Sequence, residues 1–142
     1  MKTKLTSAFF IAIAFLLCAP GGSAVAQGVK EKTLKNGTNV IVVRTLAPAE
    51  VVSVKPYIDA KEGKKIGRLK MDVVLKNTAD EPQSYSVFGQ GKTDTGGWLG
   101  GVAKAPSKGK LEPGKEVTAK VTTGYEGESV PDEMRLEVFP PQ

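Results

Sequence analysis

The sequence predicts an all-β protein, an antiparallel β-sandwich of about seven to eight short strands. Apolar residues recur at every second position in many short segments, as they do in strands with one buried and one wet face. Turn-forming residues separate these segments. Beyond the N-terminal apolar run, no segment repeats apolar residues at the three- and four-residue spacing of an amphipathic helix.

The first 26 residues are typical of an export signal. Lys2 and Lys4 give a positive start, Ala8 to Leu17 is apolar throughout, and Ala24-Val25-Ala26 offers small residues before a cleavage point. The apolar run is shorter than the roughly 20 residues that a membrane span needs, so a retained anchor is the minor alternative. We therefore expect a cleaved signal peptide over 1–26 and no membrane span in the mature protein.

The mature chain, residues 27–142, is expected to form one domain of 116 residues. It has no cysteine, because Cys18 lies within the signal, and Phe15-Leu16-Leu17 stands where a lipoprotein carries a small residue. Anchoring through a lipid at Cys18 is therefore not favoured. A domain of this size buries roughly 65% of its extended-chain surface and can fold without disulfides. The short signal and the lack of disulfides together predict a bacterial protein that is periplasmic or secreted.

Charged residues of both signs are interspersed along the mature chain. Once Lys2 and Lys4 are removed, 18 Lys and Arg face 15 Asp and Glu, a net charge of +3. Nucleic-acid-binding domains concentrate their basic residues in one footprint, and no block of five like charges occurs here. We expect a mixed, solvated surface and no nucleic-acid partner.

The N-terminal part of the domain predicts a hairpin followed by an edge strand. Asn36-Gly37 favours a two-residue turn between the strands 33–35 and 38–44, because both residues tolerate positive φ. In the strand 51–60, Val52, Val54 and Ile58 share one parity. Pro56 cannot donate a ladder hydrogen bond, which favours an edge position or a bulge for this strand.

The strongest strand pattern lies at 68–77, and the sandwich is expected to assemble around it. Four apolar residues alternate there with mostly polar ones: Leu69, Met71, Val73 and Leu75. Turn-forming residues over 77–82 end the strand. The segment 83–89 is then expected as its hairpin partner, with Tyr85 and Val87 on one face.

The remaining segments predict a long loop and two further strands. Residues 90–110 include six glycines and are expected to form loop, apart from a short strand near Trp98-Leu99. A tight turn is predicted at 111–116, because Pro113 is preset for the second turn position and Gly114 can take positive φ. Strands at 117–123 and 134–139 follow, with these residues pointing inward: Val117, Ala119, Val121, Met134, Leu136 and Val138.

Residues 68–139, about half of the chain, resemble the small immunoglobulin-like domains of bacterial envelope proteins, including the FxLYD type. The likeness rests on Leu75-Lys76-Asn77-Thr78 with Asp80-Glu81-Pro82 after it, on the turn Leu111-Glu112-Pro113-Gly114-Lys115, and on the apolar alternation that follows. The resemblance implies an immunoglobulin-like sandwich with an accessory or binding role and no reaction.

Composition limits the chemistry that this chain can perform. Histidine is absent from the whole chain and cysteine from the mature part. The usual zinc and copper ligands and the Ser-His-Asp and Cys-His catalytic arrangements are therefore missing. The paired carboxylates at 59/62, 80/81 and 132/133 lack the spacing of a calcium loop and are expected to serve turns and surface. We expect no enzyme, no metal site and no cofactor.

The candidate partner-binding residues are Trp98, Lys92, Lys104 and Lys108. Trp98 stands between the pairs Gly96-Gly97 and Gly100-Gly101, which lack the Gly-Lys-Ser/Thr ending of a phosphate-binding loop. An exposed aromatic residue with neighbouring cations can stack on a sugar or anchor a protein. The alternative is that Trp98 fills or closes the core, which the usual high burial of tryptophan favours.

The sequence thus predicts an exported, non-enzymatic binding module of the bacterial cell envelope. It would recognise a protein or glycan through the Trp98 loop or through an exposed sheet edge, for which 51–60 is the candidate. The alternative is a proteinase inhibitor of immunoglobulin-like fold that inserts the loop 90–110 into an active-site cleft. The glycines disfavour this, because tight inhibitors present rigid loops. The sequence indicates neither the identity of the partner nor the oligomeric state.

Overall fold

The computed structural model describes residues 29–141, and the predicted signal at 1–26 lies outside them. Within the described part there are eight strands and no helix, so the all-β prediction is confirmed and no membrane-spanning helix occurs there. The strands are β1 (Lys30–Asn36), β2 (Asn39–Thr45), β3 (Ala49–Asp59), β4 (Gly67–Asn77), β5 (Tyr85–Lys92), β6 (Trp98–Ala105), β7 (Glu116–Gly127) and β8 (Glu133–Phe139).

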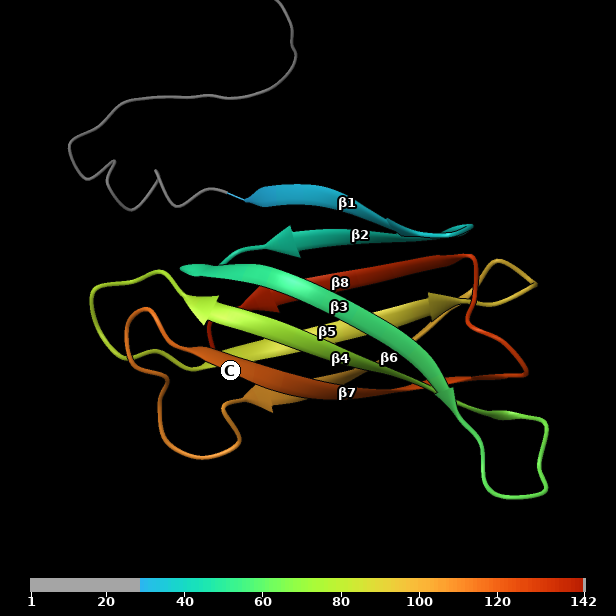
Figure 1. The fold of residues 1–142 in the computed structure, drawn as a ribbon. Coiled ribbons are helices and arrows are strands. Elements are labelled where there is room, and N and C mark those ends of the chain that lie inside the picture. The colour runs from blue at the N-terminus through green and yellow to red at the C-terminus, as the bar shows by residue number, and fades with distance from the viewer. Residues whose placement is uncertain (1–28, 142) are drawn as a thin grey trace, which may run out of the picture.

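The strands form two sheets that pack against one another (Figure 1). The larger sheet has the order β1-β2-β8-β5-β6 and the smaller sheet the order β3-β4-β7. Every strand pair is antiparallel except β2 with β8, which is parallel. The expectation of a purely antiparallel sandwich is wrong at that pair. Alternation along a strand reports which face is buried, and it carries no information about the direction of the neighbouring strand.

The predicted organising strand, β4, is the middle strand of the smaller sheet, between β3 and β7. Its four alternating apolar side chains are fully buried. Apolar residues of the larger sheet pack in the same core, namely Ile41, Val43, Tyr85, Val87, Met134, Leu136 and Val138. Burying one large apolar side chain contributes about 1.5–3 kcal/mol, so this shared layer holds the two sheets together.

β3 lies at the edge of the smaller sheet, as Pro56 predicted. A bulge between Val51 and Ser53 shifts the register of this strand. Because a bulge inserts one extra residue, it moves the residues before it onto the other parity. Val51 therefore shares the inner face with Val54, whereas Val52 is 46% exposed and its expected place on the buried parity is wrong.

β5 does not pair with β4, so the expected hairpin between them is wrong. The chain crosses instead to the larger sheet, where β5 lies between β6 and β8. The expected face was nevertheless right, because Tyr85 and Val87 are fully buried. Residues of either sheet have the same alternation, so the pattern could place Tyr85 inward without identifying the strand beside it.

The segment 90–110 is a hairpin in the structure and not a long loop. β5 extends to Lys92 and β6 begins at Trp98, which leaves a turn over 93–97. The amide of Thr93 donates to the carbonyl of Gly97 at 2.7 Å, and the amide of Gly97 donates to Oγ1 of Thr93 at 3.0 Å. The Ala105–Pro106 peptide bond at the end of β6 is cis.

Gly101 of β6 occupies a position where a side chain would not fit. A Cβ placed on Gly101 would collide with the carbonyl oxygen of Thr122 in β7. The backbone of β6 therefore approaches the backbone of β7 more closely than a side chain would permit. This approach closes the sandwich along the side where β6 and β7 meet.

The turns were predicted close to where they occur. In the first hairpin Asn36 pairs with Asn39, so the two-residue turn is Gly37-Thr38, one residue later than expected. Gly37 has a φ of 65° and Gly114 a φ of 78°, values in the left-handed region that favours glycine. The amide of Gly114 donates to the carbonyl of Asn77 at 2.9 Å, which joins the turn at 111–116 to the end of β4.

Candidate functional site

Ion pairs cross the strands on the outer faces of both sheets. On the smaller sheet, ion pairs cross the strands at Lys70–Asp59 (2.7 Å), Arg68–Glu126 (3.2 Å) and Lys120–Asp72 (3.6 Å). Opposite charges that face one another across strands are typical of a surface kept in water. Val52 of β3, at 46%, is the most exposed of the large apolar residues in β3, β4 and β7.

The outer face of the larger sheet carries several exposed or partly exposed apolar residues. Val102 of β6 is 65% exposed, and its cross-strand neighbour Phe88 in β5 is partly exposed. Further partly exposed apolar residues occupy outward positions of the neighbouring strands, namely Val40, Val42, Trp98 and Phe139. Exposed apolar residues grouped on one face, with polar residues around them, are a mark of an interaction surface. We call these six residues and the charged side chains between them the outer face.

Trp98 lies on this outer face, at the start of β6, and not in the core. Its side chain is partly buried because Arg135 of β8 covers it, with the guanidinium carbon 3.8 Å from the ring centroid. Lys92 is its cross-strand neighbour, and Nζ of Lys92 lies 6.0 Å from the same centroid. The part of the favoured alternative that places Trp98 within the core is therefore wrong.

The structure brings two of the four predicted site residues together. Trp98 and Lys92 adjoin, and Lys92 also pairs with Glu133 at 3.4 Å. Lys104 points to the same face but lies six residues further along β6, roughly 20 Å from Trp98 at the rise of a strand. Lys108 lies in the exposed segment that follows β6, beyond the sheet.

Three residues of the site were missed at the sequence level: Arg135, Gln90 and Gly100. Arg135 pairs with Gln90, and Gln90 pairs with Gly100, so the three form one row across β8, β5 and β6. A Cβ on Gly100 would lie 2.7 Å from Cγ of Gln90 and 3.0 Å from Cε1 of Phe88. The side chains of Gln90 and Phe88 therefore pack against this glycine, where a larger residue would crowd them. Alternation did predict that Arg135 points outward, but only the order of the strands places it beside Trp98.

A hollow of about 770 Å³ lies beside Arg135 on the outer face. Its lining comes from four strands and the residue before β1, namely Val29, Glu31, Val42, Arg44, Gln90, Arg135, Leu136 and Glu137. Within it Arg44 pairs with Glu137 at 3.0 Å and with Glu31 at 3.8 Å. Both carboxylates of the hollow thus pair with one arginine, Arg44, and Arg135 lines the same hollow.

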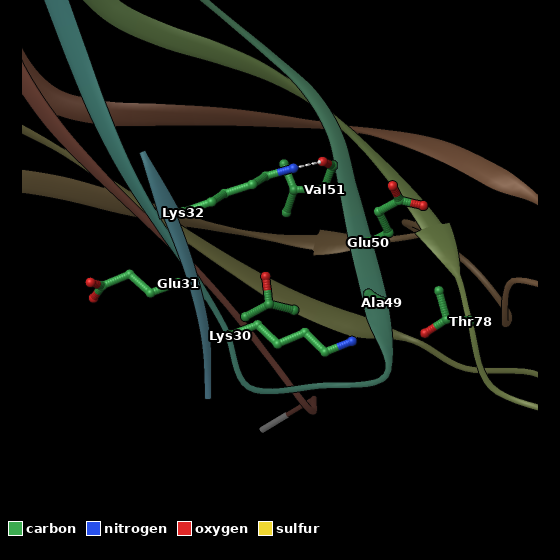
Figure 2. A pocket seen from close by; sticks show the side chains of 8 residues that line it. Lys30, Glu31, Lys32, Ala49, Glu50, Val51 and Thr78 are labelled. Carbon is green, nitrogen blue, oxygen red and sulfur yellow. Dashed lines mark hydrogen bonds between the residues drawn. The ribbon is translucent and has the colours of Figure 1, made fainter. Parts of the chain in front are cut away.

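The sheet edges, the other predicted site, are protected. β1 and β3 are edge strands, and the cleft between them has a volume of about 290 Å³ (Figure 2). Figure 2 shows Lys32 of β1 extending across this cleft, where its Nζ donates to the carbonyl oxygen of Val51 at 2.6 Å. Lysines on β1, and a bulge and a proline on β3, are devices that discourage strand addition.

The described residues show no arrangement suited to metal chemistry. Nowhere in 29–141 do three or more His, Cys, Asp or Glu side chains group so that they could hold a metal ion. The clearest perturbed group is Tyr85, whose pKa burial raises to about 12. Its hydroxyl donates to the carbonyl of Pro48 at 2.9 Å inside the sandwich, which is a structural role.

Comparison of the chain with protein-family models, with curated proteins and with solved structures finds no match.

Proposed function

We propose that this protein is an exported, non-enzymatic binding module of the bacterial envelope, which recognises a protein partner with the outer face of the larger sheet. The observation that carries the proposal is the set of partly exposed aromatic and aliphatic residues that share the outer face of the larger sheet with Trp98 and Arg135. Cross-strand ion pairs occur on both sheets and surround these residues on the larger one. Tryptophan and arginine are the residue types most enriched at the energetic centres of protein interfaces.

We also propose that the sandwich is immunoglobulin-like. The sheet β3-β4-β7 has the arrangement of strands A, B and E, and β6-β5-β8 that of C′, C and F. β2 then occupies the place of strand G beside F, although it runs parallel to its neighbour. In folds of this class, binding sites are carried on faces, edges or loops, and the fold alone does not specify a partner.

A protein partner is favoured over a glycan by the position of Arg135. Carbohydrates bind aromatic side chains by stacking on an open ring face, whereas the guanidinium of Arg135 covers a face of Trp98 at 3.8 Å. Beside Arg135 lies a hollow of about 770 Å³ with apolar and charged lining, which suits the side chains of a polypeptide. Strand addition is the less favoured mode because Lys32 caps the carbonyl of Val51.

The proteinase-inhibitor alternative receives no specific support from the described residues. It needed a long loop at 90–110, and this segment is a hairpin whose turn closes on itself through hydrogen bonds of Thr93 with Gly97. A closed turn does not present the extended backbone that a protease cleft accepts as a strand.

The test is a pull-down from bacterial envelope extract with the purified mature domain, repeated with Trp98→Ala. We expect the variant to lose the specific partner, because truncating an interface tryptophan commonly costs 2 kcal/mol or more, about a thirtyfold loss of affinity. Tyr57→Ala is the matched control, since Tyr57 is a partly exposed aromatic residue on the outer side of β3. If Trp98→Ala retained every partner that the unchanged domain captures, the outer face would not be the binding site.

A further inference from the structure

We infer that Arg135 is the anchor for a carboxylate of the protein partner, so that the partner presents an Asp or Glu side chain next to apolar ones. This inference rests on the proposed function and specifies its partner. Three observations support it: the ion pairs of the outer face, the contact of Arg135 with Trp98, and the hollow beside Arg135.

Arg135 is a cation of the outer face that forms no ion pair with a carboxylate of the described residues. Glu31 and Glu137 both pair with Arg44, and Glu133 pairs with Lys92. Across residues 29–141, no carboxylate lies within ion-pair distance of Arg135. Its guanidinium lies over the ring of Trp98. The guanidinium of Arg135 is therefore available to bind an anionic group of a partner.

The contact with Trp98 restricts the guanidinium of Arg135, which is otherwise exposed to solvent. A guanidinium stacked on an indole keeps its N–H donors in the plane of the group, where they remain open to a further acceptor. Two parallel N–H donors of arginine match the two oxygens of a carboxylate, and this charge-assisted arrangement is among the stronger hydrogen-bonded pairs. Because stacking restricts the side chain before binding, less conformational entropy is lost when the partner arrives.

The surroundings of Arg135 favour a carboxylate on a polypeptide over a phosphate group. Glu31 and Glu137 in the hollow share one ion-pair partner, Arg44, so one excess negative charge lies near Arg135. The single charge of Arg135 therefore matches one carboxylate and does not neutralise a doubly charged phosphate. Val42 lines the hollow, and Phe88 and Val102 lie in the next row of the sheet, so apolar side chains of the partner find contacts on either side.

The experiment selects binders from a displayed library of random twelve-residue peptides. The targets are the unchanged mature domain, Arg135→Gln, Trp98→Ala and Arg68→Gln. Arg68 is the matched control, because it is an exposed arginine on the outer side of the smaller sheet, paired with Glu126. Circular dichroism and thermal unfolding of each variant establish that it folds.

Peptides selected on the unchanged domain and on Arg68→Gln should be enriched in Asp or Glu beside apolar residues. With Arg135→Gln the acidic preference should disappear while the apolar preference persists. For the strongest peptide, replacing its acidic residue by the corresponding amide should weaken binding about tenfold or more, and Arg135→Gln should abolish the difference. A phosphoserine at the same position should bind less well than the carboxylate.

The outcomes separate this inference from the function on which it rests. Peptides that need Trp98 but show no acidic preference, or that keep it with Arg135→Gln, would refute the carboxylate anchor and leave the outer face intact. Tighter binding of the phosphoserine peptide would refute the choice of a carboxylate. A library that yields no peptide dependent on Trp98 would contradict both proposals.

Discussion

Asn77 is a polar side chain with 1% of its surface exposed, at the end of the central strand β4. Its Nδ2 donates to the carbonyls of Glu81 at 3.0 Å and Leu111 at 2.8 Å, and its Oδ1 accepts from the amide of Ala79 at 2.7 Å. Both turn motifs that suggested an immunoglobulin-like domain are therefore bonded to one buried amide. A buried polar group is tolerated only when its hydrogen bonds are made, as they are here.

Replacing Asn77 by alanine should lower the free energy of unfolding by about 2–4 kcal/mol, because three hydrogen bonds are lost and their backbone partners stay partly buried. Urea unfolding followed by circular dichroism measures the change. Asn39→Ala is the control, since its Nδ2 makes one partly buried bond, to Pro131 at 3.0 Å, and should cost about 1 kcal/mol. Equal losses for the two variants would show that the amide of Asn77 does not organise the two turns.

β6 begins where the sequence predicted a short strand, at Trp98-Leu99, but it is longer than predicted. Its eight residues include Gly100 and Gly101 and continue from the glycine pair of the turn, so propensity favoured a loop. In the structure each glycine of the strand has a separate reason. Gly100 makes room for Gln90 and Phe88 on the outer face, and Gly101 lets the backbone of β6 reach that of β7. These reasons exist only once the neighbours are in place, so composition alone could not show them.

Gly101→Ala should destabilise the domain by about 2–3 kcal/mol or more, because the new Cβ collides with the carbonyl of Thr122 and the backbone must shift. Gly124→Ala in β7 is the control: its Cβ would meet nothing closer than 3.9 Å, so little change is expected. Thermal and urea unfolding of both variants would test this. A Gly101→Ala variant as stable as the unchanged domain would mean that β6 and β7 are less closely apposed than described.

The two sheets are joined differently at their two pairs of edges, β6 with β7 and β1 with β3. The backbones of β6 and β7 approach each other closely at Gly101. Between β1 and β3, the side chain of Lys32 donates a hydrogen bond to the carbonyl of Val51. The N-terminal hairpin thus completes the larger sheet and also shields the edge of the smaller one. Tyr85, fully buried in β5, ties the segment between β2 and β3 to the core through Pro48.

Alkaline pH should lower the free energy of unfolding through ionisation of Tyr85. Its pKa is raised from 10.0 to about 12 by burial, so the folded state holds the phenolic proton longer than the unfolded state does. The stability contributed by the neutral phenol is complete below pH 10 and is lost as the pH rises from 10 toward 12. Urea midpoints at pH 9 and pH 11.5 should differ less for Tyr85→Phe than for the unchanged domain. An identical pH dependence would contradict a role for this group.

The sequence by itself determined the all-β class, the inward residues of β4, β7 and β8, an edge position or a bulge for the strand of Pro56, and the turns near Gly37 and Gly114. Each of these follows from local chemistry: the two-residue period of a strand, the missing amide hydrogen of proline and the conformational freedom of glycine. Val52 is an exception, because a single-residue bulge reverses parity and leaves no mark in composition.

The tertiary structure alone decided which strands are neighbours, and with that the composition of the candidate site. Trp98 and Lys92 were indicated by their residue types, but Arg135 lies 37 positions beyond Trp98 in the sequence and reaches it only because β8 pairs with β5. Long-range pairing depends on the packing of all eight strands together, and the alternation within one strand is compatible with several neighbours. The residues of the site were therefore present in the sequence, while their arrangement was fixed by the order of the strands.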